Sequence, residues 1–364
     1  MSNLNILQHH ERFSTEKEYR AYPCVSYSIL KDVYWIPELL EPSKQRHPSK
    51  YMNLGSAVDI LLTSLKKKDE IIIVNSLPAD SIQKMVKFLI NDEKLDLIDD
   101  ITDDQVIGAY NSIESKVNWG IPAKKANLLE KGREYFNIYN DIESGDVIII
   151  TEHMFNVAND IIMMLNTSPI TKNIIHSFDK EDEYEVIYQY KFTYELYGVT
   201  IKSMIDLIVI NHTKKTINLY DLKIGGYEET ENTGTYTSFL RSFTRFKWMY
   251  QGCLYKTGFT KFVKTIFPDY LVENFKFLYV NAANLKYPYL YNMSMKYNSE
   301  ILLDGIYDGY YELPSIKKVC KAVNYYLRTM ETEGITVDKL LPYPIWHAGE
   351  AGIRISHSSI NSYL

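Results

Sequence analysis

Short apolar segments in the second half of the chain carry the pattern of a β-sheet. Within them apolar and polar side chains alternate, or β-branched and aromatic residues follow one another, and turn residues separate one segment from the next. Short β-rich segments of this kind are typical of strands. The sequence therefore predicts five strands, over residues 184–196, 199–210, 216–224, 274–283 and 287–294.

Helical periodicity marks most of what precedes these strands. Residues 53–68 place apolar side chains three and four positions apart, which predicts a helix with Gly55 near its start. A shorter helix is predicted to begin after Ser28 and to break before Pro37, because proline cannot continue a helix. Further helices are predicted between residues 78 and 177, over 238–258, and over 314–334.

The order of these elements predicts the fold class. Helices, then a cluster of strands, then a helix and further strands are typical of an α/β core with a helical addition. No repeat, low-complexity tract or flexible linker divides the chain. We therefore expect one domain over residues 1–364, with a mainly helical insertion at 66–180 and the sheet with its following helix at 181–290.

Composition adds broad limits. The chain has 364 residues, of which 46% are hydrophobic and 24% charged, so it can bury a core. The opening segment is too polar for a signal peptide, and no apolar run reaches the roughly 18 residues that span a bilayer. These features lead us to expect a cytoplasmic protein without a membrane partner.

Charge and cysteine content bear on partners and cofactors. The net charge of −6 argues against a nucleic-acid partner, but basic residues concentrate locally, in FLRSFTRFKW and SIKKVCKAVNYYLR. The 31 tyrosines could stack on bases, although an AT-rich gene is the simpler explanation. Cys24, Cys253 and Cys320 form no CxxC pair, so we expect neither a zinc site nor an iron–sulfur cluster.

Two of the predicted strands carry charges among their aliphatic residues. Asp221 and Lys223 lie two positions apart and so share one strand face. If residues 199–210 and 216–224 form a hairpin around Thr213-Lys214, opposing residue numbers add to 427. Asp206 then lies across from Asp221, with about 5 Å between the Cβ atoms. A divalent cation would convert the repulsion of these two carboxylates into coordination, and hard oxygen ligands favour Mg²⁺ or Mn²⁺. The alternative is an exposed hairpin whose charges have no function.

This arrangement resembles the core of the PD-(D/E)XK nucleases, and more narrowly the RecB-like branch with the phage RecE and lambda-type recombination exonucleases. The aspartate that ends an apolar strand and the following YDLKIG carry the resemblance. NLGSAVDILL is similar to the first motif of the branch, with Asp59 where His or Glu is usual. WMYQGCLY matches the helix motif Q-x-x-x-Y through Gln251 and Tyr255, and VSYSILKDVYWIP is similar to the opening helix of the RecE-like enzymes.

The resemblance implies a restriction-endonuclease-like core with a mixed central β-sheet flanked by helices. It implies a Mg²⁺- or Mn²⁺-dependent deoxyribonuclease, most simply an exonuclease on linear double-stranded DNA in phage-type recombination or DNA metabolism. The chain would then be phage-encoded and act in the host cytoplasm, with a single-strand annealing protein or further copies of itself as partners.

The resemblance also assigns roles to individual residues. Asp59, Asp206, Asp221 and the Leu222 carbonyl would hold the metal, and Lys223 would orient the attacking water. A second-tier acidic residue, Glu185, would contact metal or water. The residues expected to position DNA are Gln251, Tyr255 and Arg245.

Other interpretations of the same residues stay open. Gln251 could simply cap a strand where its helix packs on the sheet. A structure-specific or restriction-like endonuclease would share the site. A catalytically inactive DNA-end-binding module of the same fold would also fit, because Asp59 departs from the residue usual at its position.

Overall fold

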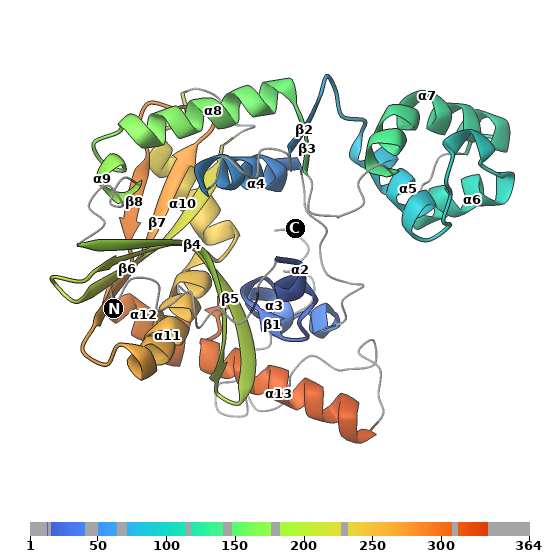
Figure 1. The fold of residues 1–364 in the computed structure, drawn as a ribbon. Coiled ribbons are helices and arrows are strands. Elements are labelled where there is room, and N and C mark those ends of the chain that lie inside the picture. The colour runs from blue at the N-terminus through green and yellow to red at the C-terminus, as the bar shows by residue number, and fades with distance from the viewer. Residues whose placement is uncertain are drawn as a thin grey trace. The chain divides into compact units, whose positions relative to one another are not determined.

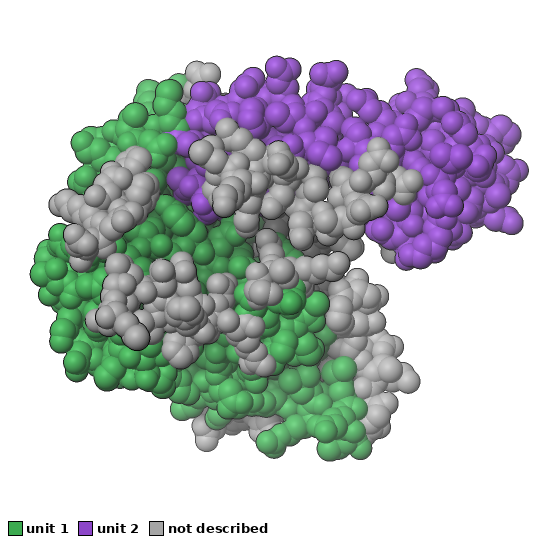
Figure 2. All heavy atoms as spheres, viewed as in Figure 1, with its two compact units in different colours: residues 1–48, 163–364 green, residues 49–162 purple. Residues whose placement is uncertain are grey.

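The computed structural model describes residues 13, 16–40, 50–63, 71–113, 118–140, 148–175, 183–226, 232–307 and 312–333. The chain divides into two compact units. Unit 1 comprises residues 1–48 and 163–364, and unit 2 comprises residues 49–162 (Figure 2). The boundary falls inside helix α8 (Glu152–Thr167).

A mixed six-stranded sheet forms the centre of unit 1 (Figure 1). Its strands follow the order β1-β5-β6-β7-β8, and β4 pairs with β5 as well. The β1–β5 and β6–β7 pairs are parallel, whereas the β4–β5, β5–β6 and β7–β8 pairs are antiparallel. The strand bounds are β1 Val25–Ser26, β4 Tyr184–Leu196, β5 Val199–Asn211, β6 Thr216–Gly225, β7 Leu271–Asn281 and β8 Tyr289–Asn292.

The five predicted strands are confirmed as β4 to β8, and the two-residue β1 was not predicted. The predicted hairpin register is also confirmed, since the ladder runs from Leu207↔Tyr220 to Asn211↔Thr216, pairs whose numbers add to 427. In the loop between these strands, the Asn211 side chain accepts the Lys214 amide at 2.6 Å. An asparagine side chain that bonds its own backbone stabilises a turn that lacks glycine.

The predicted helix over residues 238–258 is two helices, α10 (Thr235–Arg245) and α11 (Trp248–Ile266). Lys247 separates them in a left-handed backbone conformation, with φ 54°. The prediction of a single helix was therefore wrong, because the helix is interrupted near Lys247, and the second helix continues to Ile266, beyond the predicted end at Gly258. An uninterrupted periodicity of apolar residues gave no signal of the break, because each helix keeps the pattern on its own buried face.

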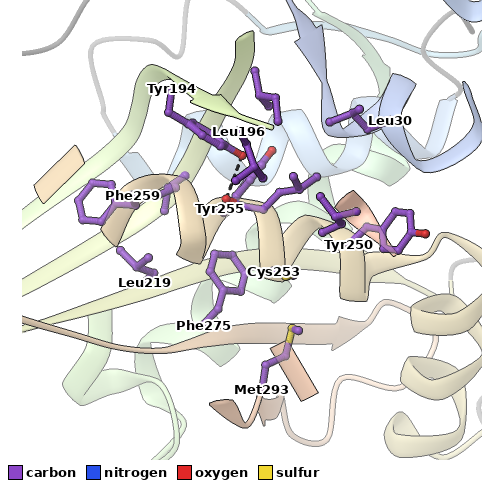
Figure 3. Close-up of a cluster of buried hydrophobic side chains, with 14 of the residues drawn as sticks. Leu30, Tyr194, Leu196, Leu219, Tyr250, Cys253, Tyr255, Phe259, Phe275 and Met293 are labelled. Carbon is purple, nitrogen blue, oxygen red and sulfur yellow. Dashed lines mark hydrogen bonds between the residues drawn. The ribbon is translucent and has the colours of Figure 1, made fainter. Parts of the chain in front are cut away.

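Helix α11 is the central helix of unit 1. It contacts β4 and β7, and twelve of its nineteen residues are buried, so it is surrounded by protein on most sides. The Tyr194 hydroxyl from β4 donates to the Leu254 carbonyl at 2.9 Å (Figure 3). Tyr255, Phe259 and Phe275 pack in the same cluster.

Unit 1 contains further helices and a pair of short strands besides the sheet, α10 and α11. α3 contacts β5 and α11, and α13 contacts α3, β5 and α12. Their bounds are α2 Glu16–Ala21, α3 Tyr27–Val33, η1 Pro37–Leu40, α9 Lys172–Ile175, α12 Met295–Leu303 and α13 Ile316–Glu333, with the strand pair β9 Ile306–Tyr307 and β10 Glu312–Leu313.

Unit 2 has its own hydrophobic core, formed mainly by its helices. It also contains a parallel two-stranded sheet of β2 and β3, which the helical prediction for residues 66–180 did not include. The bounds are α4 Lys50–Thr63, β2 Ile71–Val74, α5 Asp80–Asn91, η4 Ile98–Asp100, α6 Asp103–Ser112, α7 Ile121–Asn140 and β3 Ile148–Thr151.

Candidate active site at a fork between two strands

Strands β5 and β6 separate where their aspartates lie. One edge of β5 is paired with β4 along its length, and the other edge is shared by β1, at Ile201 and Lys202, and by β6, from Leu207 onward. Beyond Leu207↔Tyr220, β6 continues beside β7 alone. The sheet therefore forks at the pair that would come next in register.

Asp206 and Asp221 are that next pair. They are not part of the ladder, so the predicted direct opposition is replaced by another contact. Oδ2 of Asp206 accepts the Leu222 amide at 2.8 Å. A carboxylate thus satisfies a backbone donor near the point where the strands diverge, and this bond keeps Asp206 beside the residue that follows Asp221.

The sheet is also irregular on the other side of Asp206. Gln189 of β4 has φ 49°, and the pairs Tyr188↔Leu207 and Tyr190↔Ile205 flank it. Ile205 and Ile208 both belong to the main core, whereas Leu207 belongs to a smaller, separate cluster with Val209 and Tyr220. The two-residue alternation is therefore interrupted at Asp206. Local distortions that re-aim a side chain are common beside active sites.

Asp221 is fully buried, with 0% of its surface exposed. Its Oδ2 lies 2.5 Å from Nζ of Lys223, and its Oδ1 accepts a hydrogen bond from the Gln251 amide. Burial raises the pKa of the Asp221 carboxyl above its ordinary value, and the Lys223 ammonium opposes that rise without cancelling it. The site therefore holds a carboxylate in an environment that disfavours its charge.

Helix α11 brings two more predicted residues to this carboxylate. Gln251 and Tyr255 lie one helical turn apart, and both are buried. Burial raises the pKa of the Tyr255 hydroxyl; Tyr19, Asp221 and Asp206 add to the rise, and a hydrogen bond with Gln251 opposes it. Gln251 bonds the Asp221 side chain rather than a strand backbone, so the capping role considered from the sequence is not what the structure shows.

Aromatic residues around Lys223 were not assigned from the sequence. Nζ of Lys223 lies 5.7 Å from the centroid of the Trp248 ring, and Trp248 begins α11. Tyr27 of α3 donates its hydroxyl to the Phe246 carbonyl, and burial raises its pKa, with Asp221 and then Asp32 adding to the rise. Only the position of Trp248, three residues before Gln251, offered a sequence signal.

The other three predicted side chains come from elements outside β5, β6 and α11. Asp59 lies on α4 in unit 2. Glu185 pairs with Ile210 of β5, four residues from Asp206 or about 13 Å along the strand. There its Oε2 lies 3.3 Å from Nε2 of His212. Arg245 is exposed at the end of α10.

The donor set in unit 1 is consistent with a hard divalent cation but incomplete. Asp206 and Asp221 supply carboxylate oxygens, which Mg²⁺ and Mn²⁺ prefer, and Oδ2 of the buried Asp221 is held by the Lys223 ammonium. Within the described residues no three His, Cys, Asp or Glu side chains gather as a ready metal cluster. A complete coordination sphere would need a further ligand, for which Asp59 is the sequence-based candidate.

Comparisons with known proteins show a likeness to a solved structure. No family model matches the chain, and no curated protein matches it. Its fold is similar to the crystal structure of the Eubacterium rectale protein named "Putative exonuclease", with 14% identity over 94% of this chain and 97% of that chain, and a TM-score of 0.42. A TM-score of this size carries no argument about activity. Among the described helices, none is long and apolar enough to cross a membrane.

Proposed function

We propose that this chain is a divalent-metal-dependent deoxyribonuclease, an exonuclease on linear double-stranded DNA. One observation carries the proposal: a fully buried aspartate, Asp221, is paired at 2.5 Å with Lys223 where two strands fork beside a second aspartate. The resemblance of YDLKIG and its surroundings to the PD-(D/E)XK nucleases supports it from the sequence.

The energetics of the site also favour a functional explanation. Removing a carboxylate or an ammonium from water costs several kcal/mol for each ion, and a buried pair often stabilises a fold less than apolar residues of the same volume would. Asp221 stays buried among the aliphatic residues of the sheet, and its pKa is raised. A group kept in such an environment at the expense of stability is a candidate for catalysis.

Each residue then has a role in phosphodiester hydrolysis. Asp206 and Asp221 would hold Mg²⁺ or Mn²⁺, with Asp59 and the Leu222 carbonyl as further proposed ligands. When bound, the metal would act as a Lewis acid on the scissile phosphate. Lys223 would orient the attacking water through its ammonium protons.

Neighbouring groups position these residues. The Gln251 amide fixes one oxygen of Asp221, and the Leu222 amide fixes one oxygen of Asp206. The second oxygen of Asp221 faces the Lys223 ammonium. Phosphodiester hydrolysis needs little covalent chemistry from the protein, so fixed carboxylates and a fixed lysine are its main contribution.

A second function is favoured by the same ion pair. Because the Lys223 ammonium contacts Asp221 directly, it occupies space that a cation on Oδ2 would need. In a DNA-end-binding module without turnover, this pair would simply persist. A structure-specific or restriction-like endonuclease would use the same residues as the proposed exonuclease.

An assay with end-labelled linear double-stranded DNA in Mg²⁺, Mn²⁺ or EDTA tests these possibilities. We expect degradation that requires the metal, and covalently closed circular DNA that stays intact. Lys223→Ala should remain folded and bind DNA yet lose turnover by about 10²-fold or more. Lys276→Ala is a matched control, because Lys276 lies on the neighbouring strand and also faces a carboxylate, Glu273, at 3.4 Å.

Metal binding is measured separately from turnover. A ligand that binds only the folded state stabilises it by about 2.7 kcal/mol at a hundred times its Kd, so Mg²⁺ or Mn²⁺ should raise the melting temperature, and Asp206→Ala should abolish that shift. Cleavage of the closed circle would favour the endonuclease. Near-normal degradation by Lys223→Ala would overturn the assigned mechanism, and metal-independent DNA binding without degradation would favour the inactive module.

A further inference from the structure

Acidic residues are absent from one long stretch of an otherwise acidic protein. Asp and Glu number 46 in 364 residues, yet residues 232–268 contain none and carry six Lys and Arg. This stretch forms α10 and α11, which adjoin the candidate active site. A cationic segment in a protein of net charge −6 suits a polyanionic partner.

Helix α10 has one buried face and one exposed face. Thr235, Ser238, Phe239 and Phe243 are buried. On the other face and at the helix end lie large apolar and cationic side chains, and two of the rings are well exposed, Tyr236 at 54% and Phe246 at 41%. We call this set the α10 patch: Tyr236, Leu240, Arg241, Arg245 and Phe246.

A line of ring contacts connects the α10 patch with the candidate active site. The Arg245 guanidinium lies 5.4 Å from the centroid of the Phe246 ring. Phe246 stacks on Trp248, with 5.9 Å between centroids and 24° between planes. On Trp248 lies the Lys223 ammonium, at 5.7 Å, and Lys223 contacts Asp221. An exposed ring with a cation beside it is thus two contacts away from Lys223.

We propose that the α10 patch binds single-stranded DNA and leads that strand to or from the Asp221–Lys223 pair. This inference rests on the proposed function for the identity of the nucleic acid. Exposed rings bind bases by stacking, and arginines beside them neutralise the phosphates. In a duplex the bases are stacked on one another, so their faces are closed to Phe246 and Tyr236. The patch therefore fits a separated strand and not an intact double helix.

Binding of fluorescein-labelled oligo(dT) to the full chain, followed by anisotropy in EDTA, tests the inference without turnover. Stacking contributes enough per base that Phe246→Ala should weaken binding by about tenfold. Arg245→Gln should weaken it less and lower the slope of log K against log salt by about 0.7. Tyr325→Ala is the matched control, because Tyr325 is an exposed aromatic residue on another helix, α13, with 43% of its surface exposed.

The possible results separate this inference from the proposed function. Weaker oligo(dT) binding by Phe246→Ala, with no loss for Tyr325→Ala, supports the patch even if no DNA is degraded in Mg²⁺. Unchanged binding overturns it even if the wild-type chain is an active nuclease. If Phe246→Ala loses as much affinity for blunt duplex DNA as for oligo(dT), the patch contacts a duplex and the inference is overturned. If Phe246→Ala changes the oligomeric state in sedimentation without changing the affinity for oligo(dT), the patch contacts another copy of the chain, and the inference is overturned as well.

Discussion

Replacing Gln251 by leucine tests the contact on which the geometry of the candidate site depends. Gln251 is buried on α11 and donates its amide to Oδ1 of the fully buried Asp221. Leucine has a similar volume but no donor, so the helix keeps its packing while the carboxylate loses one of two partners. The remaining partner is the Lys223 ammonium at 2.5 Å.

The size of the effect follows from the charge of the acceptor. A hydrogen bond to a charged group contributes about 1.5–3 kcal/mol, and a bond between neutral groups about 0.5–1.5 kcal/mol. We therefore expect Gln251→Leu to lower the free energy of unfolding by about 2–3 kcal/mol. With Asp221→Asn already present, the same change should cost about 1 kcal/mol, which gives a coupling energy of about 1–2 kcal/mol.

Urea unfolding of the four proteins in EDTA measures this coupling. The urea concentration at the unfolding midpoint should shift, while the slope of the unfolding free energy against urea concentration stays constant. A changed slope would indicate an altered unfolded state. A cost below about 0.5 kcal/mol for Gln251→Leu, or equal costs in both backgrounds, would show that the amide does not bind Asp221 in solution. The proposed positioning role of Gln251 would then be lost.

Three further predictions concern other parts of unit 1. Gly258→Ala should destabilise the fold by about 1–3 kcal/mol in a thermal melt, because an added Cβ would overlap the buried Tyr194 ring. Glu185→Gln should leave turnover per folded molecule unchanged, because Glu185 lies on β4 opposite Ile210, about 13 Å along the strand from Asp206, and contacts His212. A large loss of turnover would restore the catalytic assignment of Glu185. Burial alone would raise the pKa of Asp32, but Lys247, whose Nζ lies 2.8 Å away, and a second lysine hold it below its ordinary value. Asp32→Asn should therefore be less stable at neutral pH, and its difference from wild type should shrink as the pH falls from about 4 through the lowered pKa. A constant difference in acid unfolding curves would contradict this.

The part of the fold that sequence predicted best is the β5–β6 hairpin. Its register follows from local information, because a shift by one residue would move every aliphatic side chain to the opposite face of the sheet. The sum of 427 for opposing residues therefore held from Leu207↔Tyr220 to Asn211↔Thr216. That register was enough to place Asp206 and Asp221 near each other.

The fork at those aspartates could not be predicted in the same way. It arises because β6 leaves β5 and continues beside β7, a strand that begins at Leu271, some fifty residues later in the chain. Pairing over such a separation depends on packing of the whole sheet. The left-handed residue Lys247 escaped prediction for a related reason, since the direction of α11 is decided by the core it enters.

The direct contact between Lys223 and Asp221 changes how the predicted residues work together. The sequence placed Lys223 on the same strand face as Asp221, and the structure closes the distance to 2.5 Å. A cation on Oδ2 of Asp221 would displace the ammonium, whose side chain is 21% exposed and lies against Trp248. The displaced ammonium would stay within reach of a water or phosphate oxygen on the side where the ring contacts lead to the α10 patch. Without a metal, the same ammonium offsets the buried charge of Asp221. Under the proposed mechanism, one lysine would therefore stabilise the metal-free site and orient the water once the metal is bound.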